Sequence, residues 1–411
     1  MQDGRWQYSH VGAYAFVSIV PRIESMTTPR NRFDVIVVGL GAMGSATAYH
    51  LALRGRRVLG LDRWSPGHTF GSSHGDSRII REAYFEHPMY VPILRRAYDL
   101  WRELEVRSGE ALLHEIGGLM IGPRDGELVT GTLRSAAEFG IGADVLSAAQ
   151  VHARHPAFHL RPGEVAVLDR RAGYLDPDRC NAAHLRVAAA AGATLRFDEP
   201  VSSWSATDDE VRVETNGGSY AADHLVLCGG ARMPQLAADA RLPLVVERQL
   251  LFWLEPDASD ARFDRATFPI YLYQYEAESG FSWCYGFPRL PRGIKAAVMH
   301  QGDVVGDPDT VRRTVDDGEV APLRRALSSL LPDLARAPVR ESAVCLFTNT
   351  PDLHFVIDVH PAHRGGRVIV SSACSGHGYK FASAIGEIQA DLVMVGRSRF
   401  DLRPFSATRF A

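Results

Sequence analysis

Lysine is almost absent from this chain. Of the 45 lysine and arginine residues, only Lys295 and Lys380 are lysine, and all the others are arginine. On a solvated surface the two residue types are nearly exchangeable, so a compositional drift towards arginine would have replaced both lysines unless an ammonium group is needed there. Lys295 and Lys380 are therefore candidate functional residues.

Cysteine and net charge are also scarce. Five cysteines are scattered over 411 residues without a CxxC pair, which argues against a disulfide scaffold and a paired-cysteine zinc site. The formal net charge is −3, so no summed positive field would hold nucleic acid or an anionic membrane. We expect no nucleic-acid partner, no membrane partner and no metal. Free thiols suit a cytoplasmic location.

No long apolar run predicts a membrane span. The stretch 35–53 lacks charged residues, but three glycines interrupt it where a turn is required. A shorter apolar run at 11–20 has no positively charged segment before it and no small-residue cleavage site after it. Because Met26 looks like a natural start, we predict that residues 1–26 form a disordered leader outside the fold.

The next segment carries a dinucleotide-binding pattern. Residues 33–38 (FDVIVV) predict a buried parallel strand, and the turn with Gly39, Gly41 and Gly44 leads into an alanine-rich helix. A second strand ends at Asp62, 23 residues after Gly39. The glycines let the backbone approach a pyrophosphate at the helix N-terminus, and the acid accepts from ribose hydroxyls. NAD and FAD share this pattern.

Two later strands favour FAD over NAD. Residues 224–227 form an apolar run that ends in a glycine turn, and residues 367–372 (RVIVSS) precede the glycine-containing turn at 375–380. Binding elements spread from residue 34 to 380 suit an extended flavin nucleotide better than a nicotinamide held by one half-domain.

Four further stretches follow one another along the chain: HTFGSSHGDSRIIREAY from His68, YGFP with GIKAAVMH between Tyr285 and His300, CLFTNTPDLHFVIDVHP from Cys345, and SGHGYKF from Ser375. Together they resemble monomeric sarcosine oxidase and N-methyltryptophan oxidase, flavin enzymes of the D-amino-acid-oxidase class. The resemblance covers most of the chain, from about residue 33 to 405.

The resemblance implies an α/β fold in which a Rossmann-like FAD-binding domain is interleaved with a substrate domain built on a mixed, largely antiparallel sheet. The FAD-binding domain is predicted to take residues 27–113, 173–245 and 342–411. The substrate domain is predicted to take residues 114–172 and 246–341, where alternating apolar runs indicate antiparallel strands.

The resemblance also implies how the cofactor is held. Cys345 matches the cysteine that ties the flavin 8α-methyl group through a thioether, so we expect covalent FAD; the alternative is an ordinary buried thiol. The other residues expected to bind the cofactor are Gly39, Gly41, Gly44, Asp62, Ser72, His74, Arg78, Gly376, Gly378 and Lys380.

Four cations match residues around the flavin. Lys295 matches a lysine on the flavin face away from the substrate, where a fixed ammonium stabilises the superoxide-like charge that forms during reaction with O2. Arg81 and Lys380 match the pair that holds the substrate carboxylate, one as a bidentate fork and one as a point charge. Arg78, expected one helical turn before Arg81, matches a residue near the flavin and Lys295.

Three more residues match the lining of the substrate pocket: Tyr285, His300 and Phe347. The sarcosine oxidase pattern has a tyrosine where Phe347 stands. Losing that hydroxyl makes the pocket more apolar, which favours an amine that is larger or less polar than sarcosine.

These matches predict a monomeric oxidase of an amino-acid-like secondary amine. Hydride transfer to FAD would give an imine, and O2 would then be reduced to hydrogen peroxide. One alternative is an oxidase of a cyclic imino acid such as pipecolate or proline. A flavoprotein with structural FAD and an NAD-dependent dehydrogenase are the others, although neither explains both lysines, Cys345 and Arg81.

Overall fold

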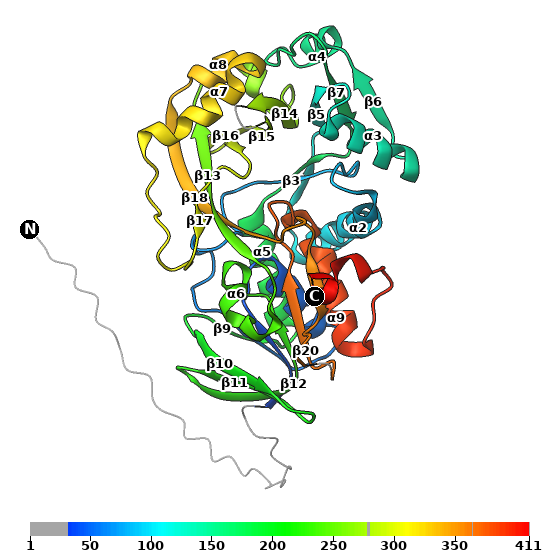
Figure 1. Cartoon of the computed structure of the whole chain (residues 1–411), viewed down its shortest axis with the longest axis vertical. Helices are drawn as coiled ribbons and strands as arrows, with labels where there is room; N and C mark the ends of the chain where they lie inside the picture. Colours follow the sequence, from blue (N-terminus) through cyan, green and yellow to red (C-terminus); the bar gives the residue numbers. More distant parts are fainter. Residues whose placement is uncertain (1–31, 278–279, 364, 411) are drawn as a thin grey trace, which may run out of the picture.

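The computed structural model of the chain describes residues 32–277, 280–363 and 365–410. The predicted leader at residues 1–26 lies outside the described residues. Two large sheets dominate the fold: an eight-stranded sheet in the lower half of Figure 1 and a nine-stranded sheet in the upper half. A small three-stranded sheet accompanies them.

The centre of the eight-stranded sheet is parallel. Strand β1 (Arg32–Val38) pairs with β2 (Val58–Leu61) on one side and with β12 (Gly218–Leu227) on the other. Strands β9 (Thr194–Arg196) and β20 (Val368–Ser372) extend the parallel order beyond β2 and β12. Continuous apolar runs such as VIVV of β1 form these strands because both faces of the sheet are covered.

Antiparallel strands extend this sheet beyond β12, whereas the parallel strand β9 forms its other edge. Strands β10 (Val201–Ala206) and β11 (Val211–Thr215) form a meander with β12, and β19 (Val356–Val359) pairs with β20. The described part of the first sheet is thus the predicted Rossmann-like unit, with strands drawn from widely separated parts of the chain.

Helix α1 (Ala42–Leu53) begins directly after β1 and packs against α5 (Pro177–Ala190) and α9 (Ala382–Val395). Glycine is required in its first turn, because a Cβ atom at Gly44 would lie 1.7 Å from the carbonyl oxygen of Gly39. The other helices are α2 (Val91–Ser108), α3 (Glu127–Phe139), α4 (Ala148–Arg154), α6 (Met233–Leu236), α7 (Ala321–Leu330) and α8 (Pro332–Arg336). No helix in the described ranges is long and apolar enough to cross a bilayer.

The nine-stranded sheet has the order β17, β13, β16, β15, β14, β5, β7, β6, with β18 also paired to β13. Its strands are β5 (Gly118–Pro123), β6 (Ala143–Leu146), β7 (Glu164–Asp169), β13 (Val245–Leu254), β14 (Ile270–Ala277), β15 (Gly280–Leu290), β16 (Gly293–Val298), β17 (Val304–Val305) and β18 (Val339–Asn349). Only the β14–β5 pair is parallel among these described strands. This confirms the predicted mixed, largely antiparallel sheet.

Strand β18 crosses the predicted domain boundary at residue 342. It pairs with β13 from Val339 to Asn349, so it belongs to the nine-stranded sheet. The domain boundaries themselves stay predictions.

The third sheet contains β3 (Arg78–Ile80), β4 (Leu113–Glu115) and β8 (Gly173–Leu175). Strand β3 replaces the helical turn that we expected between Arg78 and Arg81, and that expectation was wrong. Two consecutive β-branched isoleucines favour the extended backbone, and antiparallel pairing with β8 holds it.

Candidate active site

A large cavity of about 1360 Å³ is lined by residues from both large sheets. Its volume exceeds the usual range for a single small ligand, about 300–1,000 Å³, so it can accommodate an extended dinucleotide together with a small second molecule. The predicted site residues that line it are Gly39, Gly41, Asp62, Ser72, Arg78, Arg81, Tyr285, Cys345, Phe347, Gly376, Gly378 and Lys380. Gly44, His74, Lys295 and His300 are not among the described lining residues.

The nucleotide end of the cavity is built on the turn between β1 and α1. Gly39 has a φ of 87°, and a Cβ atom there would lie 2.4 Å from the carbonyl oxygen of Cys228. The Asp62 carboxylate accepts the N–H of Leu40 at 2.7 Å and the N–H of Trp64 at 2.9 Å. Because no acidic residue occupies the first turn of α1, the positive end of the helix dipole suits a pyrophosphate.

A second glycine turn, which follows β20, also lines the cavity. Gly376 has a φ of 76°, and a Cβ atom at Gly378 would lie 1.8 Å from the carbonyl oxygen of Ala373. The turn leads into the short 3-10 helix η6 (Tyr379–Phe381), which carries Lys380. Glycine at these two positions therefore serves close backbone packing and brings Lys380 to the cavity wall.

Cys345 and Arg78 meet on the cavity wall. Cys345 lies on β18 and is 2% exposed. Its Sγ atom accepts from Nη2 of Arg78 at 3.6 Å, and the same Nη2 donates to the carbonyl oxygen of Ser72 at 2.8 Å. A guanidinium beside a sulfur stabilises negative charge on it. This arrangement places a potential nucleophile where an extended cofactor would pass.

Lys295 lies on β16 and is 1% exposed. Its ammonium donates to the carbonyl oxygens of Gly75, at 2.6 Å, and Ser77. Burial and the nearby charge of Arg78 lower the pKa of Lys295 well below its usual range. The ammonium thus lies against the backbone of the segment that carries Arg78.

His74 lies in that same segment and is 3% exposed. Burial and the charges of Arg78 and Lys295 lower the pKa of His74 to about 3, so its ring is neutral. It contributes no charge to the cavity at neutral pH.

Arg81 and Lys380 present two buried cations to one wall. Nη2 of Arg81 donates to both carboxylate oxygens of Glu86 at 2.6 Å, while Nη1 has no hydrogen-bond partner among the described residues. Nζ of Lys380 donates to the carbonyl oxygen of His377 at 2.7 Å and to the hydroxyl of Tyr84 at 3.3 Å. A buried donor without a partner is costly, so a ligand carboxylate would fit against Nη1.

The titratable groups on this wall differ in whether their charge changes near neutral pH. Burial raises the pKa of Glu86, but the charges led by Arg81 outweigh it and hold that pKa below its usual value. Burial and the charge of Arg81 lower the pKa of Lys380 to about 7. Burial also lowers the pKa of His377 to about 4. Lys380 is therefore the group on this wall that titrates near neutral pH.

Tyr285 on β15 and Phe347 on β18 line the cavity, as do the apolar side chains of Leu272, Phe287 and Met299. Burial raises the pKa of Tyr285 to about 12, so its hydroxyl stays protonated at neutral pH. Most of this wall is apolar.

His300 lies next to two residues of the cavity lining, Phe347 and Gly376. Its ring centroid lies 5.4 Å from that of Phe347, and a Cβ atom at Gly376 would lie 3.2 Å from its Nε2 atom. Its Nδ1 atom lies 3.1 Å from a carboxylate oxygen of Glu247. The predicted role of His300 in the substrate pocket stays a prediction.

Sequence reasoning missed Glu86, Tyr84 and His377, which contact the two cations. Glu86 had a visible signal, since it is an acid within the otherwise apolar and aromatic run AYFEHP, five residues after Arg81. Tyr84 and His377 lie inside the family-like stretches, and the hydrogen bond between them, at 2.7 Å, depends on the fold.

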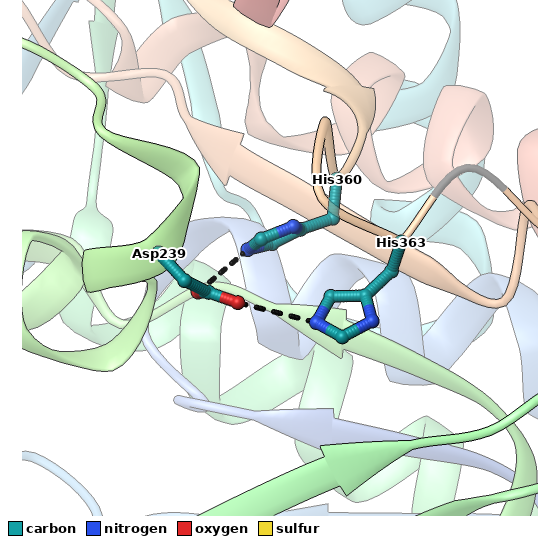
Figure 2. Close-up of side chains that lie close together, drawn as sticks. All are labelled: Asp239, His360 and His363. Atoms are coloured by element: carbon teal, nitrogen blue, oxygen red, sulfur yellow. Dashed lines mark hydrogen bonds and ion pairs between the residues drawn. The ribbon is translucent and has the colours of Figure 1, made fainter.

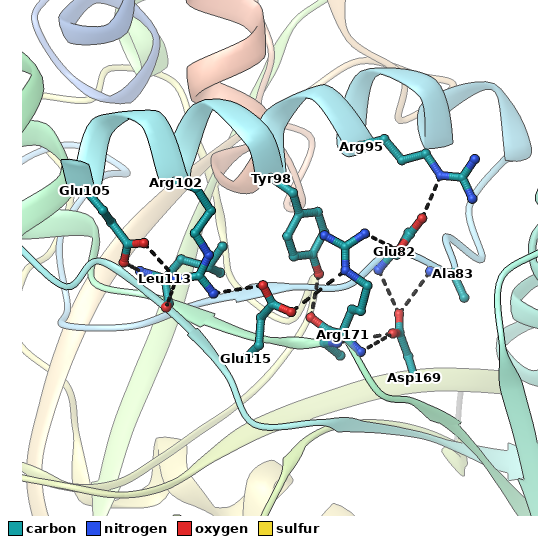
Figure 3. Close-up of polar contacts among 11 residues, drawn as sticks. Glu82, Ala83, Arg95, Tyr98, Arg102, Glu105, Leu113, Glu115, Asp169 and Arg171 are labelled. Atoms are coloured by element: carbon teal, nitrogen blue, oxygen red, sulfur yellow. Dashed lines mark hydrogen bonds and ion pairs between the residues drawn. The ribbon is translucent and has the colours of Figure 1, made fainter. Parts of the chain in front are cut away.

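Asp169 was also missed, although it fixes the backbone next to Arg81. Its buried carboxylate accepts the N–H groups of Glu82 at 2.7 Å and Ala83 at 3.0 Å. It also accepts the N–H group of Arg171 at 3.0 Å (Figure 3). A further hydrogen bond comes from the N–H group of Ala172 at 3.1 Å. The end of β7 in the nine-stranded sheet thereby holds the segment that carries Arg81. Partners this far apart leave no local sequence signal.

Comparison with known proteins adds independent information on this site. A family model described as FAD dependent oxidoreductase matches residues 34–392. The chain is 42% identical over 382 residues to monomeric sarcosine oxidase of Streptomyces avermitilis, with 92% of this chain and 98% of that protein covered. It is 31% identical over 384 residues to N-methyl-L-tryptophan oxidase of Salmonella agona, with 92% and 100% covered.

Among solved structures, the open form of NikD, an unusual amino acid oxidase, is similar to this chain with a TM-score of 0.79 and 26% sequence identity. The similarity covers 92% of this chain and 97% of that chain. The whole architecture is therefore shared, including both large sheets.

Proposed function

Because the chain belongs to the FAD dependent oxidoreductase family, we propose that it oxidises a secondary amine that carries a carboxylate, such as an N-methyl amino acid. The observation that carries this proposal is the pair of buried cations, Arg81 and Lys380, on one cavity wall. Relatives named sarcosine oxidase and N-methyl-L-tryptophan oxidase support it. Bound FAD supplies the two-electron oxidation and passes the electrons to O2, giving hydrogen peroxide.

The protein's part in the reaction is to orient the amine. Arg81 offers its unpartnered Nη1, and Lys380 offers an ammonium whose third N–H group is not used by His377 or Tyr84. When the carboxylate is held at one end, the binding energy also orients the amine for reaction. Positive charge near the substrate also disfavours its ammonium form, so no protein base is required to obtain the neutral amine.

The apolar wall selects for substrate bulk. Leu272, Phe287, Met299 and Phe347 offer no hydroxyl or charge to the substrate. We propose that the N-methyl amino acid has an apolar side chain. The same wall favours a second candidate, a cyclic imino acid such as pipecolate or proline, whose ring methylenes would contact it.

We propose that FAD is attached through Sγ of Cys345. The sulfur lies on the cavity wall and accepts a hydrogen bond from the guanidinium of Arg78. A covalent tether prevents loss of the cofactor.

We propose that Lys295 assists the reaction with O2. Its ammonium is buried against Gly75 and Ser77, in the segment that carries Arg78. Positive charge fixed in a dry region stabilises developing negative charge far more than it does in water.

We also infer a monomer in a reducing compartment such as the cytoplasm. All five cysteines are free, including Cys180, Cys228 and Cys284, which are buried. Unpaired thiols are the usual state in the cytoplasm. The printed name of the Streptomyces relative, monomeric sarcosine oxidase, supports the oligomeric state.

The substrate class is tested by peroxide release. Purified protein is assayed with sarcosine, N-methyl amino acids of increasing apolar bulk, L-proline, L-pipecolate, and matched amines without a carboxylate. We expect peroxide from bulky N-methyl amino acids and none from amines lacking the carboxylate. Turnover of the cyclic imino acids alone would select the second candidate. Equal rates with and without a carboxylate would contradict the proposed anchor.

The anchor is tested with Arg81→Ala and Lys380→Met. Each loses a charged hydrogen bond to the carboxylate, worth about 1.5–3 kcal/mol, so the apparent KM should rise roughly tenfold or more while the flavin spectrum is kept. Arg403→Ala, which changes an exposed arginine, is the control. Since Lys380 is charged only below its pKa of about 7, affinity for an unreactive carboxylate should fall as pH rises through 7. That pH dependence should vanish in Lys380→Met; if it persists, another group is titrating.

The tether is tested by denaturation. Wild-type protein precipitated with acid should stay yellow, and Cys345→Ala should release its flavin into the supernatant. Cys374→Ala, another cysteine in a lining position, should retain the flavin. Free flavin from the wild type would contradict covalent attachment.

The role of Lys295 is tested by separating the two half-reactions in a stopped-flow experiment. Lys295→Met keeps the apolar stem and removes the charge, so reoxidation by O2 should slow by on the order of 10²-fold. Reduction by the amine should change much less. An equal loss in both half-reactions would show that Lys295 only supports the fold.

A further inference from the structure

Asp239, His360 and His363 form a cluster apart from the residues assigned above. Asp239 lies on the 3-10 helix η3 (Ala238–Ala240), and the two histidines lie on the loop after β19. Figure 2 shows the carboxylate between the two imidazoles. Nε2 of His360 is 3.1 Å from one carboxylate oxygen, and Nε2 of His363 is 3.2 Å from the other.

We propose that these three side chains bind one divalent transition-metal ion, represented by Zn²⁺. One donor atom from each residue lies within 4.8 Å of the others. Zinc bonds of about 2.0–2.1 Å place neighbouring ligands of a tetrahedron roughly 3.3 Å apart. Each imidazole Nε2 lies near that distance from one of the two oxygens of Asp239, 3.1 Å for His360 and 3.2 Å for His363, so the carboxylate can face an ion shared with both rings. Two imidazoles and one carboxylate suit zinc, whereas Mg²⁺ and Ca²⁺ prefer oxygen donors. The sequence predicted no metal site. Asp239 is distant from the two histidines along the chain, and only the folded structure brings the three side chains together.

The orientation of His360 favours an ion over a simple hydrogen bond. The side chain is 0% exposed, and Nε2 has no well-aligned hydrogen-bond partner in the described residues despite its distance of 3.1 Å from Asp239. Such a short contact without hydrogen-bond alignment is typical of two ligands of one metal ion, because each donor atom points at the ion and not at the neighbouring donor atom.

Ion binding would change the tautomer of His360. Its Nδ1 atom accepts the N–H of Ala362 at 3.2 Å, so the neutral ring without an ion carries its proton on Nε2. Coordination through Nε2 moves that proton to Nδ1, and this long hydrogen bond is lost. The ring of Trp204 packs edge-on against both imidazoles, at 5.5 and 5.1 Å, and limits their rotation.

The fourth coordination position is open to water. The side chain of Asp239 is 50% exposed and that of His363 is 28% exposed, whereas His360 closes the inner side. Asp239 and His363 also contribute to the cavity wall. A bound ion would therefore join η3 to the loop after β19 at the edge of the cofactor cavity. This site does not depend on the proposed substrate.

The test is a titration of tag-free, flavin-loaded protein with Zn²⁺, after dialysis against a chelator, followed by calorimetry. We expect one equivalent per chain with micromolar or tighter affinity. His363→Ala and Asp239→Asn change exposed ligands and should weaken binding by more than about tenfold, since loss of a partner outside the coordination shell already costs that much. They are preferred to His360→Ala, which would open a cavity. Mg²⁺ should not bind at this site.

The matched control is the double variant His152→Ala with His159→Ala. These exposed histidines have ring centroids 5.2 Å apart but are not part of any three-ligand group in the described chain. Its zinc affinity should equal that of the wild type. Unchanged affinity in His363→Ala would place the zinc elsewhere. If the wild type does not bind Zn²⁺ even at millimolar concentration, the three side chains form only hydrogen bonds with one another, and the proposal is overturned.

Discussion

The buried guanidinium of Arg81 is the constraint around which the cavity wall is organised. A charge with 2% exposure must be neutralised, and Glu86 supplies the partner from the same loop. Removing one member of such a pair typically costs about 3–5 kcal/mol. The pair leaves one donor of Arg81 without a partner among the described residues. Burial and the charge of Arg81 lower the pKa of Lys380, and the charge of Glu86 opposes this shift. The same guanidinium, that of Arg81, therefore stabilises the loop through Glu86 and offers a hydrogen-bond donor to a ligand.

Interleaving of the two large sheets holds that loop in place. Asp169, at the end of β7, receives four backbone N–H groups, two of them from the residues directly after Arg81. On the same segment, Glu82 pairs with Arg95 of α2 and with Arg171 (Figure 3). The nine-stranded sheet therefore positions a side chain that faces a cavity shared with the eight-stranded sheet. Neither sheet alone could build the site.

The fold could be predicted from sequence because its signals are local. The apolar run of β1, the glycine turn and Asp62 follow one another within 30 residues. The turn requires glycine because a Cβ atom at Gly39 or Gly44 would clash with the backbone. The family-like stretches supplied the rest. The structure brings Arg78, Arg81, Cys345 and Lys380 to one cavity, whereas Lys295 and His300 are not among its described lining residues. Which side of a strand or loop faces the cavity depends on tertiary packing, as the extended backbone at β3 also shows.

Strand β18 links the cofactor and substrate regions through its alternation. Cys345 and Phe347 are two residues apart, so both side chains project from the same face, and both reach the cavity. Their partners across the ladder, Gln249 and Glu247 of β13, show the same spacing. Inserting one residue before Cys345 would turn the sulfur and the aromatic ring away together. A substitution at position 347 therefore leaves the direction of the Cys345 side chain unchanged, whereas a shift in the register of this strand would move both side chains together.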